Sequence, residues 1–550
     1  MQNNNVWQSL VPADIRKEAH FNDRVVNCFP KRPANLDDML RQTAANFPDS
    51  EALVFYSGER ITYRELDARV DAAATNLTAL GLPLGERVAV YMANSIELVI
   101  TYFGILRAGM IIVPIGILQQ KPEVAYAINN CTAAILIFDG EASAKIPEAA
   151  AVPSLRYLFS VGENTLNAAS FAQLLKPAPS PFPRLPIEEE DTALIMHTSG
   201  TTGKPKGATL CHLGVWHAAK HHALCLNIHS SCRTVLVIPG THVSGVVAII
   251  MSTLQLGGCM VIARGFDTRQ LLQLLRDEKI TDTMAVPTIY TRILMEPDFD
   301  SFNLGSHWRS ALYGGAPMPE ATIKKLRHHL PALKLHQGYG ATETSAVSTL
   351  IPADQTAQRA TSVGAAVHCL DVRIMDENGR EMAAHDVGEI WIGGPSTVKG
   401  YWNDSAETAR NFISGYWRSG DLGTLDEEGY LRILDRRNDV INRAGYKVYS
   451  VEVENVITFI DGVVETAIVP IPCPVLGARV QAFVFANIEL SEKTIRDYCS
   501  ERLAAYKVPD FIEFCTTPLP RNLNGKIMKA PLREMALALA AQRPALRAKQ

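Results

Sequence analysis

Paired and clustered cysteines are missing from this chain of 550 residues. Its 10 cysteines are scattered, and no two of them form a C-x-x-C pair. This spacing excludes a disulfide framework of the kind that small secreted domains use, and it predicts reduced thiols in a cytoplasmic protein. The first residues also lack the basic flank and continuous apolar segment of a secretion signal, so we expect no export.

An excess of charge of either sign is absent as well. The 53 lysines and arginines stand against 57 aspartates and glutamates, which leaves a formal net charge of -4. Such a balance argues against a nucleic acid or an anionic membrane as the partner and fits an enzyme for small molecules. The length exceeds what one hydrophobic core ordinarily covers, which predicts at least two domains.

Long uninterrupted hydrophobic runs are not found either. The stretch 234–263 contains no Asp, Glu, Lys or Arg, yet prolines and glycines divide it into pieces too short to cross a bilayer. The dividing residues are Pro239, Gly240, Gly245, Gly257 and Gly258. We expect a strand, a loop, a helix and a second strand here, and no transmembrane segment.

The N-terminal third alternates between helical and extended patterns. Thr62 stands three residues before Glu65, a capping box, and apolar residues then recur at helical spacing. Residues 87–91 are predicted to form a strand, 95–107 a helix and 111–114 another strand. This alternation predicts an α/β fold built on a parallel sheet covered by helices.

The most informative stretch is residues 196–207, Met-His-Thr-Ser-Gly-Thr-Thr-Gly-Lys-Pro-Lys-Gly. Three glycines, four hydroxyl side chains and two lysines share these positions. Glycine lets backbone N–H groups turn inward, hydroxyls donate further hydrogen bonds and lysines offset negative charge, so the loop suits a polyphosphate. Because Pro205 follows Lys204, the nucleotide-binding motif G-x-x-x-x-G-K-[ST] is excluded. A flexible surface linker is the alternative.

This stretch resembles the phosphate loop of the adenylate-forming superfamily, which includes acyl-CoA synthetases, aryl-CoA ligases, adenylation domains of peptide synthetases and beetle luciferases. His197 stands where the family usually has Tyr. The resemblance implies that the loop holds the phosphates of ATP. The residues that it assigns to this role are Thr198, Ser199, Gly200, Thr201, Thr202, Gly203, Lys204 and Lys206.

Two further glycine-rich segments, 312–317 and 337–344, are each predicted to follow a strand. Ligands of open α/β sheets bind beyond the carboxyl ends of the strands, so the two segments predict a cleft. By resemblance, the nucleotide site includes Gly314, Gly315, Ala316, Tyr339, Thr342 and Glu343. Tyr339 would stack on adenine, Thr342 would contact phosphate and Glu343 would bind Mg²⁺, which prefers oxygen ligands. A strand-end turn with a solvated glutamate is the alternative.

The segment 238–245 resembles the family's acyl-pocket motif, in which His242 would line the carboxylate substrate. A hydrogen-bonded core histidine is the alternative. Adenylation domains of peptide synthetases place an Asp after the aromatic residue to bind an α-amino group, whereas this chain has Val243. An unpaired ammonium in a dry pocket is costly, so an amino-acid substrate is disfavoured. His217 and His221 are expected to pack rather than bind a metal, because no third ligand accompanies them.

Motifs of the C-terminal part resemble the same family. Asp421 would accept hydrogen bonds from both ribose hydroxyls, and Arg436 would contact ribose and phosphate. Gly445 would line the tunnel that admits a thiol acceptor. Lys526, on a loop supported by Gly525, would be the catalytic lysine.

The resemblance implies an α/β fold with a large N-terminal domain over residues 1–435, made of parallel-rich sheets covered by helices and a further β subdomain. A hinge over 436–439, in which Asn438 replaces the usual Asp or Lys, would lead to a small mobile α+β domain over 440–550. Rotation about this hinge would serve the two halves of the reaction.

The activity that the resemblance implies is that of an ATP-dependent acid–thiol ligase. It would adenylate a non-amino carboxylic acid, fatty or aryl, with ATP and Mg²⁺, and would transfer the acyl group to CoA. Two alternatives stay open: loading of the acyl group onto the phosphopantetheine of a carrier protein, and a non-catalytic nucleotide-binding relative. A homodimer is also left open.

Overall fold

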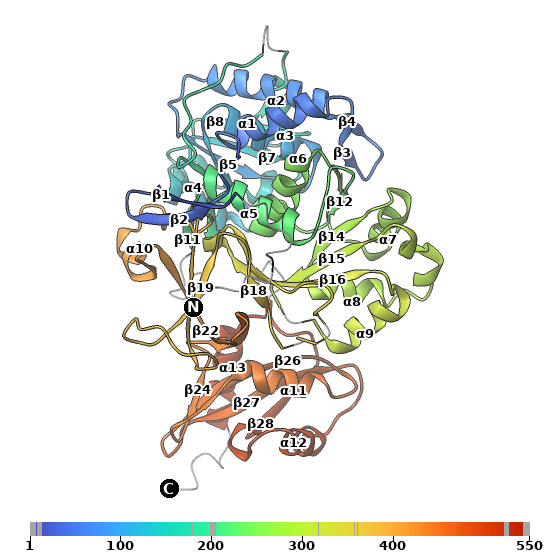
Figure 1. Cartoon of the computed structure of the whole chain (residues 1–550), viewed down its shortest axis with the longest axis vertical. Coiled ribbons are helices and arrows are strands. Elements are labelled where there is room, and N and C mark those ends of the chain that lie inside the picture. The colour runs from blue at the N-terminus through green and yellow to red at the C-terminus, as the bar shows by residue number, and fades with distance from the viewer. Residues whose placement is uncertain are drawn as a thin grey trace.

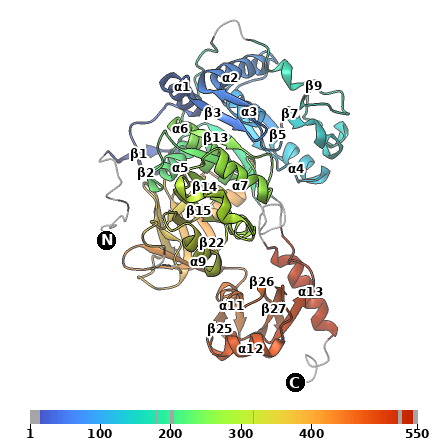
Figure 2. The same ribbon diagram turned by 90° about the vertical axis from the view of Figure 1, so that its right-hand side faces the viewer.

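The structure is a computed structural model, elongated along one axis (Figure 1). A large part holds the blue, green and yellow elements, and a small part at the lower end holds the red elements nearest the C-terminus. The view turned by 90° shows the same division (Figure 2). The residues that the structure describes are 7, 14–177, 181–198, 205–316, 318–356, 358, 359, 361–521 and 527–542, without the side chains of the last two.

One mixed sheet of the large part consists of β5 (Arg87–Tyr91), β6 (Ile111–Pro114), β7 (Ile135–Asp139), β8 (Tyr157–Val161), β9 (Ala169–Ser170), β10 (Thr192–Thr198) and β11 (Lys206–Cys211). Its spatial order is β11-β10-β6-β5-β7-β8-β9. Strands β5 to β9 and β10 pair in parallel, whereas β10 and β11 form an antiparallel hairpin. The two early strands predicted from the sequence, at 87–91 and 111–114, are confirmed.

A second sheet has one parallel half and one antiparallel half. Its strands are β3 (Glu51–Phe55), β4 (Arg60–Thr62), β12 (Arg233–Leu236), β13 (Cys259–Ile262), β14 (Asp282–Ala285), β15 (Ser310–Gly314), β16 (Lys334–Ala341), β17 (Ala346–Leu350), β18 (Gly364–Ala366), β19 (Asp371–Met375), β20 (Gly388–Gly393), β21 (Phe412–Ile413), β22 (Tyr416–Leu425) and β23 (Tyr430–Arg436). The run β3-β13-β12-β14-β15-β16 is parallel, and pairing from β16 through β17, β18 and β23 to β22 is antiparallel. The strand pairing thus changes from parallel to antiparallel at β16.

A short hairpin and ten helices accompany these sheets in the described residues. The hairpin is β1 (Arg16–His20) with β2 (Arg24–Cys28). The helices are α1 (Leu36–Asn46), α2 (Tyr63–Thr78), α3 (Ile96–Arg107), α4 (Lys121–Cys131), α5 (His212–Cys225), α6 (Ser252–Leu256), α7 (Thr268–Asp277), α8 (Pro287–Ile293), α9 (Glu320–His329) and α10 (Ser405–Asn411). The predicted capping box begins α2: the Thr62 N–H donates to Glu65 Oε2 at 2.7 Å, and the Glu65 N–H donates to Thr62 Oγ1 at 3.3 Å.

The charge-free stretch 234–263 forms the predicted succession. Strand β12 is followed by a loop, a π-helical segment (Ser244–Met251), α6 and β13. Among the described residues, no helix combines the length and the apolar character needed to cross a membrane. The stretch is apolar because it is buried in the core between the sheets.

Helix α3 is buried along its whole length, and its last turn carries an ionised side chain into the interior. The Arg107 side chain is 0% exposed, and its guanidinium contacts Asp37 at 2.5 Å, Asp67 at 2.6 Å and Asp71 at 2.6 Å. These carboxylates come from α1 and α2. The arginine therefore joins three helices, and its burial is tolerable only because every charge has a partner.

Arg107→Met should destabilise the large part by about 3 to 5 kcal/mol, because three carboxylates would lose their buried cation. Differential scanning calorimetry would show this as a lowered melting temperature. The control is Arg64→Met on α2, whose 3.0 Å contact with Asp49 joins two exposed side chains and should contribute less than about 1 kcal/mol. Equal melting temperatures for the two variants would contradict the structural role of Arg107.

The small part has its own sheets and helices. They are β24 (Ile441–Arg443), β25 (Tyr446–Val448), α11 (Ser450–Thr458), β26 (Val463–Cys473), β27 (Gly477–Ala486), α12 (Glu492–Ser500), β28 (Phe511–Cys515) and α13 (Lys529–Gln542). Strand β27 pairs antiparallel with β26 and parallel with β28. Two hydrophobic clusters pack here and draw only on residues from Ile441 onward.

The two glycine-rich segments lie partly inside strands, which corrects the prediction that they follow strands. Residues up to Gly314 belong to β15, and residues 337–341 belong to β16. A Cβ on Gly314 would lie 2.7 Å from the Gly338 carbonyl oxygen, and one on Gly340 would lie 1.7 Å from the Ala346 carbonyl oxygen. Close approach of neighbouring backbones therefore already requires these glycines, before any ligand is considered.

Candidate active site

The phosphate-loop motif lies on the β10–β11 hairpin. Thr198 and Lys206 are paired across the two strands at the end of the hairpin where the connecting segment begins. The Thr198 hydroxyl lies 3.5 Å from the Lys206 carbonyl oxygen and 3.4 Å from Glu343 Oε1. The predicted phosphate ligands between the strands, Ser199, Gly200, Thr201, Thr202, Gly203 and Lys204, lie outside the described residues.

Glu343 is placed by a tight turn between β16 and β17. A short 3-10 helix (Thr342–Thr344) follows β16, and Ser345 and Ala346 then adopt φ values of 56° and 129°. Such conformations are strained for residues with a Cβ, and strain of this kind gathers at functional sites. The turn keeps Glu343 only 8% exposed and directs its carboxylate toward the hairpin.

The Glu343 carboxylate is buried and forms no direct ion pair with a described residue, although the positive charge of Lys206 acts on it. Its Oε1 accepts hydrogen bonds from the Tyr401 hydroxyl at 3.0 Å and from the Thr198 hydroxyl at 3.4 Å. Burial raises the pKa of this carboxyl, and its own backbone N–H, the two hydroxyls and the charge of Lys206 oppose the rise. A buried carboxylate held by neutral donors is suited to an added hard cation, since oxygen atoms are the ligands that Mg²⁺ prefers.

Lys206 has a protein partner for its ammonium group. The side chain is 11% exposed and forms an ion pair with Glu407 of α10, which is 9% exposed. The ammonium nitrogen also lies 5.1 Å from the ring centroid of Tyr401. The assignment of Lys206 to the phosphates stays a prediction, and in the structure the ammonium group pairs with Glu407.

Tyr339, Asp421 and Arg436 come together from three strands. The Tyr339 hydroxyl on β16 donates to Asp421 Oδ2 on β22 at 2.6 Å. Arg436 on β23 is the register partner of Asp421, and its Nε lies 3.8 Å from Asp421 Oδ1. Burial raises the pKa of Tyr339, so the hydroxyl keeps its proton and remains a donor. Gly315 and Ala316 lie exposed at the end of the adjacent strand β15, next to this group.

His242 begins the turn that leads into the π-helical segment. Its N–H donates to the Pro239 carbonyl at 3.1 Å, and its Nδ1 lies 3.4 Å from the Ser244 N–H. Burial lowers the pKa of the imidazole, so the ring is neutral near pH 7. The buried Asn94 side chain fixes this turn through the Gly240 N–H at 2.7 Å and through carbonyl oxygens of neighbouring strands.

Comparison with known proteins identifies the chain. A family model described as AMP-binding enzyme matches residues 40–402, well over half of the chain, and a model of the AMP-binding enzyme C-terminal domain matches residues 452–526. The chain belongs to the AMP-binding enzyme family. The first match includes the hairpin, Glu343 and Tyr401, and the second ends at Lys526.

This AMP-binding enzyme is similar to several CoA ligases. It is 34% identical over 505 residues to long-chain-fatty-acid–CoA ligase FadD13 of Mycobacterium tuberculosis, which covers 91% of this chain and 98% of that protein. It is 32% identical over 482 residues to a feruloyl-CoA synthase of an Amycolatopsis species, covering 87% and 95% of the two chains. The predicted family is thereby confirmed.

Solved structures agree with this membership. ATP-bound MatB from Rhodopseudomonas palustris superposes with a TM-score of 0.85 at 29% identity, covering 92% of this enzyme and 100% of that chain. A fatty acyl CoA synthetase of Mycobacterium tuberculosis superposes with a TM-score of 0.73 at 31% identity, covering 92% and 99%. The predicted fold class, a large α/β part with a small C-terminal α+β part, is confirmed.

The histidines that follow the phosphate loop in this AMP-binding enzyme are packing residues. The His217 ring lies between the Leu213 carbonyl, 2.9 Å from Nδ1, and the Phe29 N–H, 3.1 Å from Nε2. His221 is fully buried and makes ring contacts with Phe29 and His368. Among the described residues, the two histidines form no metal-binding group with a third ligand.

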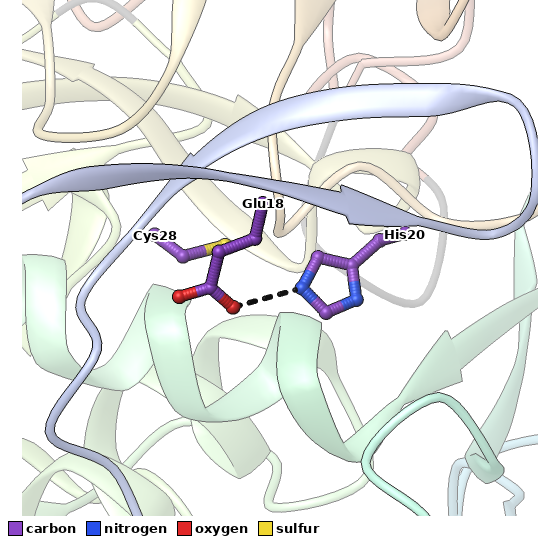
Figure 3. Close-up of side chains that lie close together, drawn as sticks. All are labelled: Glu18, His20 and Cys28. Carbon is purple, nitrogen blue, oxygen red and sulfur yellow. Dashed lines mark hydrogen bonds and ion pairs between the residues drawn. The ribbon is translucent and has the colours of Figure 1, made fainter.

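A different group, on the β1–β2 hairpin, brings three metal-ligating residue types together (Figure 3). Figure 3 shows Glu18 and His20 facing each other with Cys28 beside them. Arg32 donates to both Glu18 oxygens, at 3.1 and 2.6 Å, and its hydrogen bonds lower the pKa of Glu18 to about 2. Burial raises the pKa of the Cys28 thiol to about 12, so it is protonated. The group is therefore an ion-pair network, which Arg32 extends to Glu189 just before β10.

The predicted hinge contacts the small part at both ends. Asp435, at the end of β23, is buried and accepts hydrogen bonds from the N–H and hydroxyl of Ser450 on α11. At the other end, Arg533 of α13 donates to the Asn438 carbonyl at 3.1 Å and forms an ion pair with Asp439. Side chains of the small part thus fix both ends of the segment.

The structure describes Gly445, the residue predicted to line the thiol tunnel, but not Lys526, the predicted catalytic lysine. Gly445 lies exposed between β24 and β25 with φ of 89°, and its N–H donates to Asn442 Oδ1 at 3.2 Å. Lys526 lies outside the described residues. The flanks of its loop are held together, because Arg521 and Ile527 form an antiparallel bridge and the Met528 N–H donates to the Pro520 carbonyl at 2.8 Å.

Sequence reasoning missed Tyr401 and Glu407, the partners of Glu343 and Lys206. Tyr401 lies in a Gly-Tyr-Trp run and Glu407 in a short amphipathic helix, and both patterns are common in proteins. Neither has a spacing relation to the phosphate loop that could have singled it out. Both residues reach the site because Tyr401, in the chain after β20, forms an antiparallel bridge with Ala208 of β11.

Proposed function

We propose that this AMP-binding enzyme is an ATP-dependent acid–thiol ligase that adenylates a non-amino carboxylic acid and transfers the acyl group to CoA. The observation that carries the proposal is the contact between Thr198, at the base of the phosphate-loop hairpin, and the buried carboxylate of Glu343. The relatives act on long-chain fatty, feruloyl and 2-succinylbenzoate groups as CoA ligases. We therefore infer a fatty or aryl acid as the substrate class.

Glu343 would hold Mg²⁺ and, through it, the phosphates. The fit rests on this structure: the carboxylate is buried, receives two hydroxyl donors and has no lysine or arginine ion pair among the described residues. When bound, Mg²⁺ supplies positive charge to phosphate oxygens as the pyrophosphate departs. The Thr198 hydroxyl and the donors of the phosphate loop, with Thr342 beside Glu343, would position the same oxygens.

The nucleoside would occupy the edge formed by β15, β16 and β22. Tyr339 would stack on adenine beside Gly314, Gly315 and Ala316. Asp421 would accept hydrogen bonds from both ribose hydroxyls, and Arg436 would neutralise the charge beside it. In the structure, one Asp421 oxygen accepts a hydrogen bond from Tyr339 and the other faces Arg436. Hydrogen bonds from the ribose hydroxyls would therefore replace contacts that Asp421 already makes.

The two half-reactions follow from these positions. An oxygen of the substrate carboxylate attacks the α-phosphorus of ATP, and the bond from that phosphorus to pyrophosphate breaks. The thiolate of CoA then attacks the carbonyl carbon of the acyl adenylate, and the bond to AMP breaks. His242, neutral and buried, would line the acyl group, and Lys526 would bridge carboxylate and phosphate oxygens in the first half-reaction.

The proposed domains are residues 1–435 and 440–550, with a hinge over 436–439. The separate hydrophobic clusters of the small part support this division. Because Asp435 and Asp439 both contact the small part, through α11 and α13, rotation about 436–439 would have to break the hydrogen bonds between Asp435 and Ser450. Rotation would withdraw Lys526 and bring Gly445 to the acyl adenylate.

The test of the function is a screen of purified enzyme with ATP, Mg²⁺ and short, medium, long, aryl and dicarboxylic acids. Pyrophosphate release and hydroxamate formation should appear with a fatty or aryl acid and not with amino acids. CoA and a phosphopantetheinylated carrier protein are then compared as acceptors. Turnover with the carrier alone would favour the carrier-loading alternative, and no pyrophosphate release with any acid would indicate a non-catalytic relative.

Gly445→Trp should block thioester formation by about 100-fold while pyrophosphate release continues, because a bulky ring would fill the proposed tunnel. Single-turnover assays with preformed acyl adenylate measure the second half-reaction alone. The matched control is Gly429→Trp, since both glycines have positive φ, 89° and 84°, and open space around the Cβ position. Equal loss of both half-reactions in Gly445→Trp would contradict the tunnel assignment.

A further inference from the structure

The backbone of residues 400–411 is fastened to the second strand of the phosphate-loop hairpin, and α10 lies close to β11 (Figure 1). The Gly400 carbonyl accepts from the Thr209 N–H at 3.0 Å and from the Thr209 hydroxyl at 2.9 Å. The Trp402 N–H donates to the Gly207 carbonyl at 2.7 Å. We call residues 400–411 the clamp segment, because these contacts hold it in register with β11.

The clamp segment and the residues just before it also hold the turn that carries Glu343. The Tyr401 hydroxyl donates to Glu343 Oε1 at 3.0 Å, and the Val398 N–H donates to the Glu343 carbonyl oxygen at 2.9 Å. The Ser345 hydroxyl donates to the Ser396 carbonyl at 2.8 Å. Both the carboxylate and the backbone of the turn are therefore fixed from the same side.

Glu407 lies in the first turn of α10, and its carboxylate is held by several donors. Its N–H is capped by Asp404 Oδ1 at 2.9 Å, which places the glutamate in the first turn of the helix. Its carboxylate accepts from the Lys206 ammonium, from the Asn411 amide at 2.8 Å and from Arg410. Moving Lys206 onto a phosphate would remove one of the two cations that contact this carboxylate, which is only 9% exposed.

We propose that Glu407 and Tyr401 are positioning residues of the adenylation site. Glu407 anchors Lys206 and with it the start of β11, and Tyr401 orients the carboxylate of Glu343. In this arrangement Lys206 pairs with Glu407, and its ammonium group does not bind the phosphates. The proposal rests on the proposed function, because it assumes that Glu343 and the hairpin serve a nucleotide triphosphate.

A double-mutant cycle tests the anchor. Lys206→Met and Glu407→Gln should each lower kcat/KM for ATP in pyrophosphate exchange by about 10- to 100-fold, and the double variant should be no worse than the poorer single variant. The control cycle is Lys324→Met with Glu320→Gln, a 2.8 Å ion pair exposed on α9, where changes should stay within about twofold. If Lys206→Met costs as much in the Glu407→Gln background as in the wild type, Lys206 contacts the phosphates and the proposal is overturned.

Tyr401→Phe tests the second contact separately. The variant keeps the ring beside Lys206 and loses the hydroxyl that donates to Glu343 and also bonds Trp417, so binding of Mn²⁺ to the enzyme with ATP, measured by electron paramagnetic resonance, should weaken about 10-fold. The control is Tyr63→Phe, which also loses a buried hydrogen bond, 2.6 Å long, to the Gly258 carbonyl. Unchanged Mn²⁺ binding in Tyr401→Phe, or an equal loss in Tyr63→Phe, would overturn the role of Tyr401.

The outcomes separate this proposal from the function on which it rests. A wild-type enzyme that releases no pyrophosphate with any acid would contradict the proposed function, while Mn²⁺ and ATP binding would still report on Tyr401. A wild-type enzyme that is active, with an additive cycle and unchanged Mn²⁺ binding, would contradict the positioning roles alone. Thermal melting of each variant shows that the compared proteins are folded.

Discussion

Lys526→Ala should slow pyrophosphate exchange by several hundredfold while the affinity for ATP changes little. The side chain is expected to contact the reacting carboxylate and phosphate oxygens, where charge changes most in the transition state. Loss of one such preorganised contact costs about 3 to 4 kcal/mol in activation free energy. On the proposed assignments, ATP in the ground state is held mainly by the phosphate loop, Glu343 and Asp421, so its dissociation constant should stay within about threefold.

The measurement pairs pyrophosphate exchange with ATP binding by calorimetry. Lys493→Ala is the control, because Lys493 is an exposed lysine of the same domain, paired with Asp497 on α12. Thioester formation from preformed acyl adenylate should survive in Lys526→Ala, since the proposed rotation would withdraw the lysine in the second half-reaction. Exchange near the wild-type rate would show that a different lysine, or different chemistry, serves the site.

Mild acid should unfold the enzyme over a narrow range below pH 6.5. Eight histidines of the described residues have a pKa lowered chiefly by burial, so they are neutral when folded and take up protons on unfolding. They are His197, His212, His217, His221, His222, His242, His336 and His368. Burial lowers the pKa of His222 to about 3 and that of His217 to about 4.

The sign follows from proton binding. Below the unfolded pKa of about 6.5, the unfolded chain binds protons that the folded chain excludes, so stability falls as pH falls. Each histidine contributes about 1.4 kcal/mol per pH unit, and eight together exceed the stability of an ordinary domain, about 5 to 15 kcal/mol, within one to two units. Buried carboxyls with raised pKa act in the opposite direction and offset part of this loss. They are Asp139, Asp282, Glu343, Asp435 and Glu454.

Calorimetric melting at pH 7.5, 6.5 and 5.5 would measure the effect. The melting temperature should fall steeply between the last two values, with a net uptake of several protons on unfolding. His221→Leu should reduce that uptake by about one proton, since the ring has no hydrogen-bond partner among the described residues and its pKa is far below the usual value. A melting temperature that is constant from pH 7.5 to 5.5 would contradict the burial of these rings.

Local patterns in the sequence were enough for much of the fold. The Thr62 and Glu65 capping box placed the start of α2, and alternating apolar runs placed β5, α3 and β6 within a residue. These features depend on neighbours in the chain, and hydrogen bonds between residues a few positions apart decide them. The same holds for the glycines and prolines that divide the stretch 234–263 into strand, helix and strand.

The candidate site was predicted unevenly. Tyr339, Asp421 and Arg436 were assigned to one nucleotide site by resemblance, and the structure brings them into contact. Lys206 was assigned to the phosphates because it follows the glycines, and its partner Glu407 could not be inferred from spacing. The histidines of α5 were expected to pack, but their number and depth of burial depend on how α5 lies among other elements.

The sequence by itself determined the family of this chain, its α/β class and the segments that we propose to bind phosphate, magnesium and ribose. These properties can be inferred from residue types at short spacings along the chain, without knowledge of the fold. The tertiary structure decided which charges are free and which are already paired. Lys206 meets Glu407, and Glu343 meets Tyr401 and Thr198, across strands far apart in the chain, because contacts between sheet neighbours depend on strand order and register.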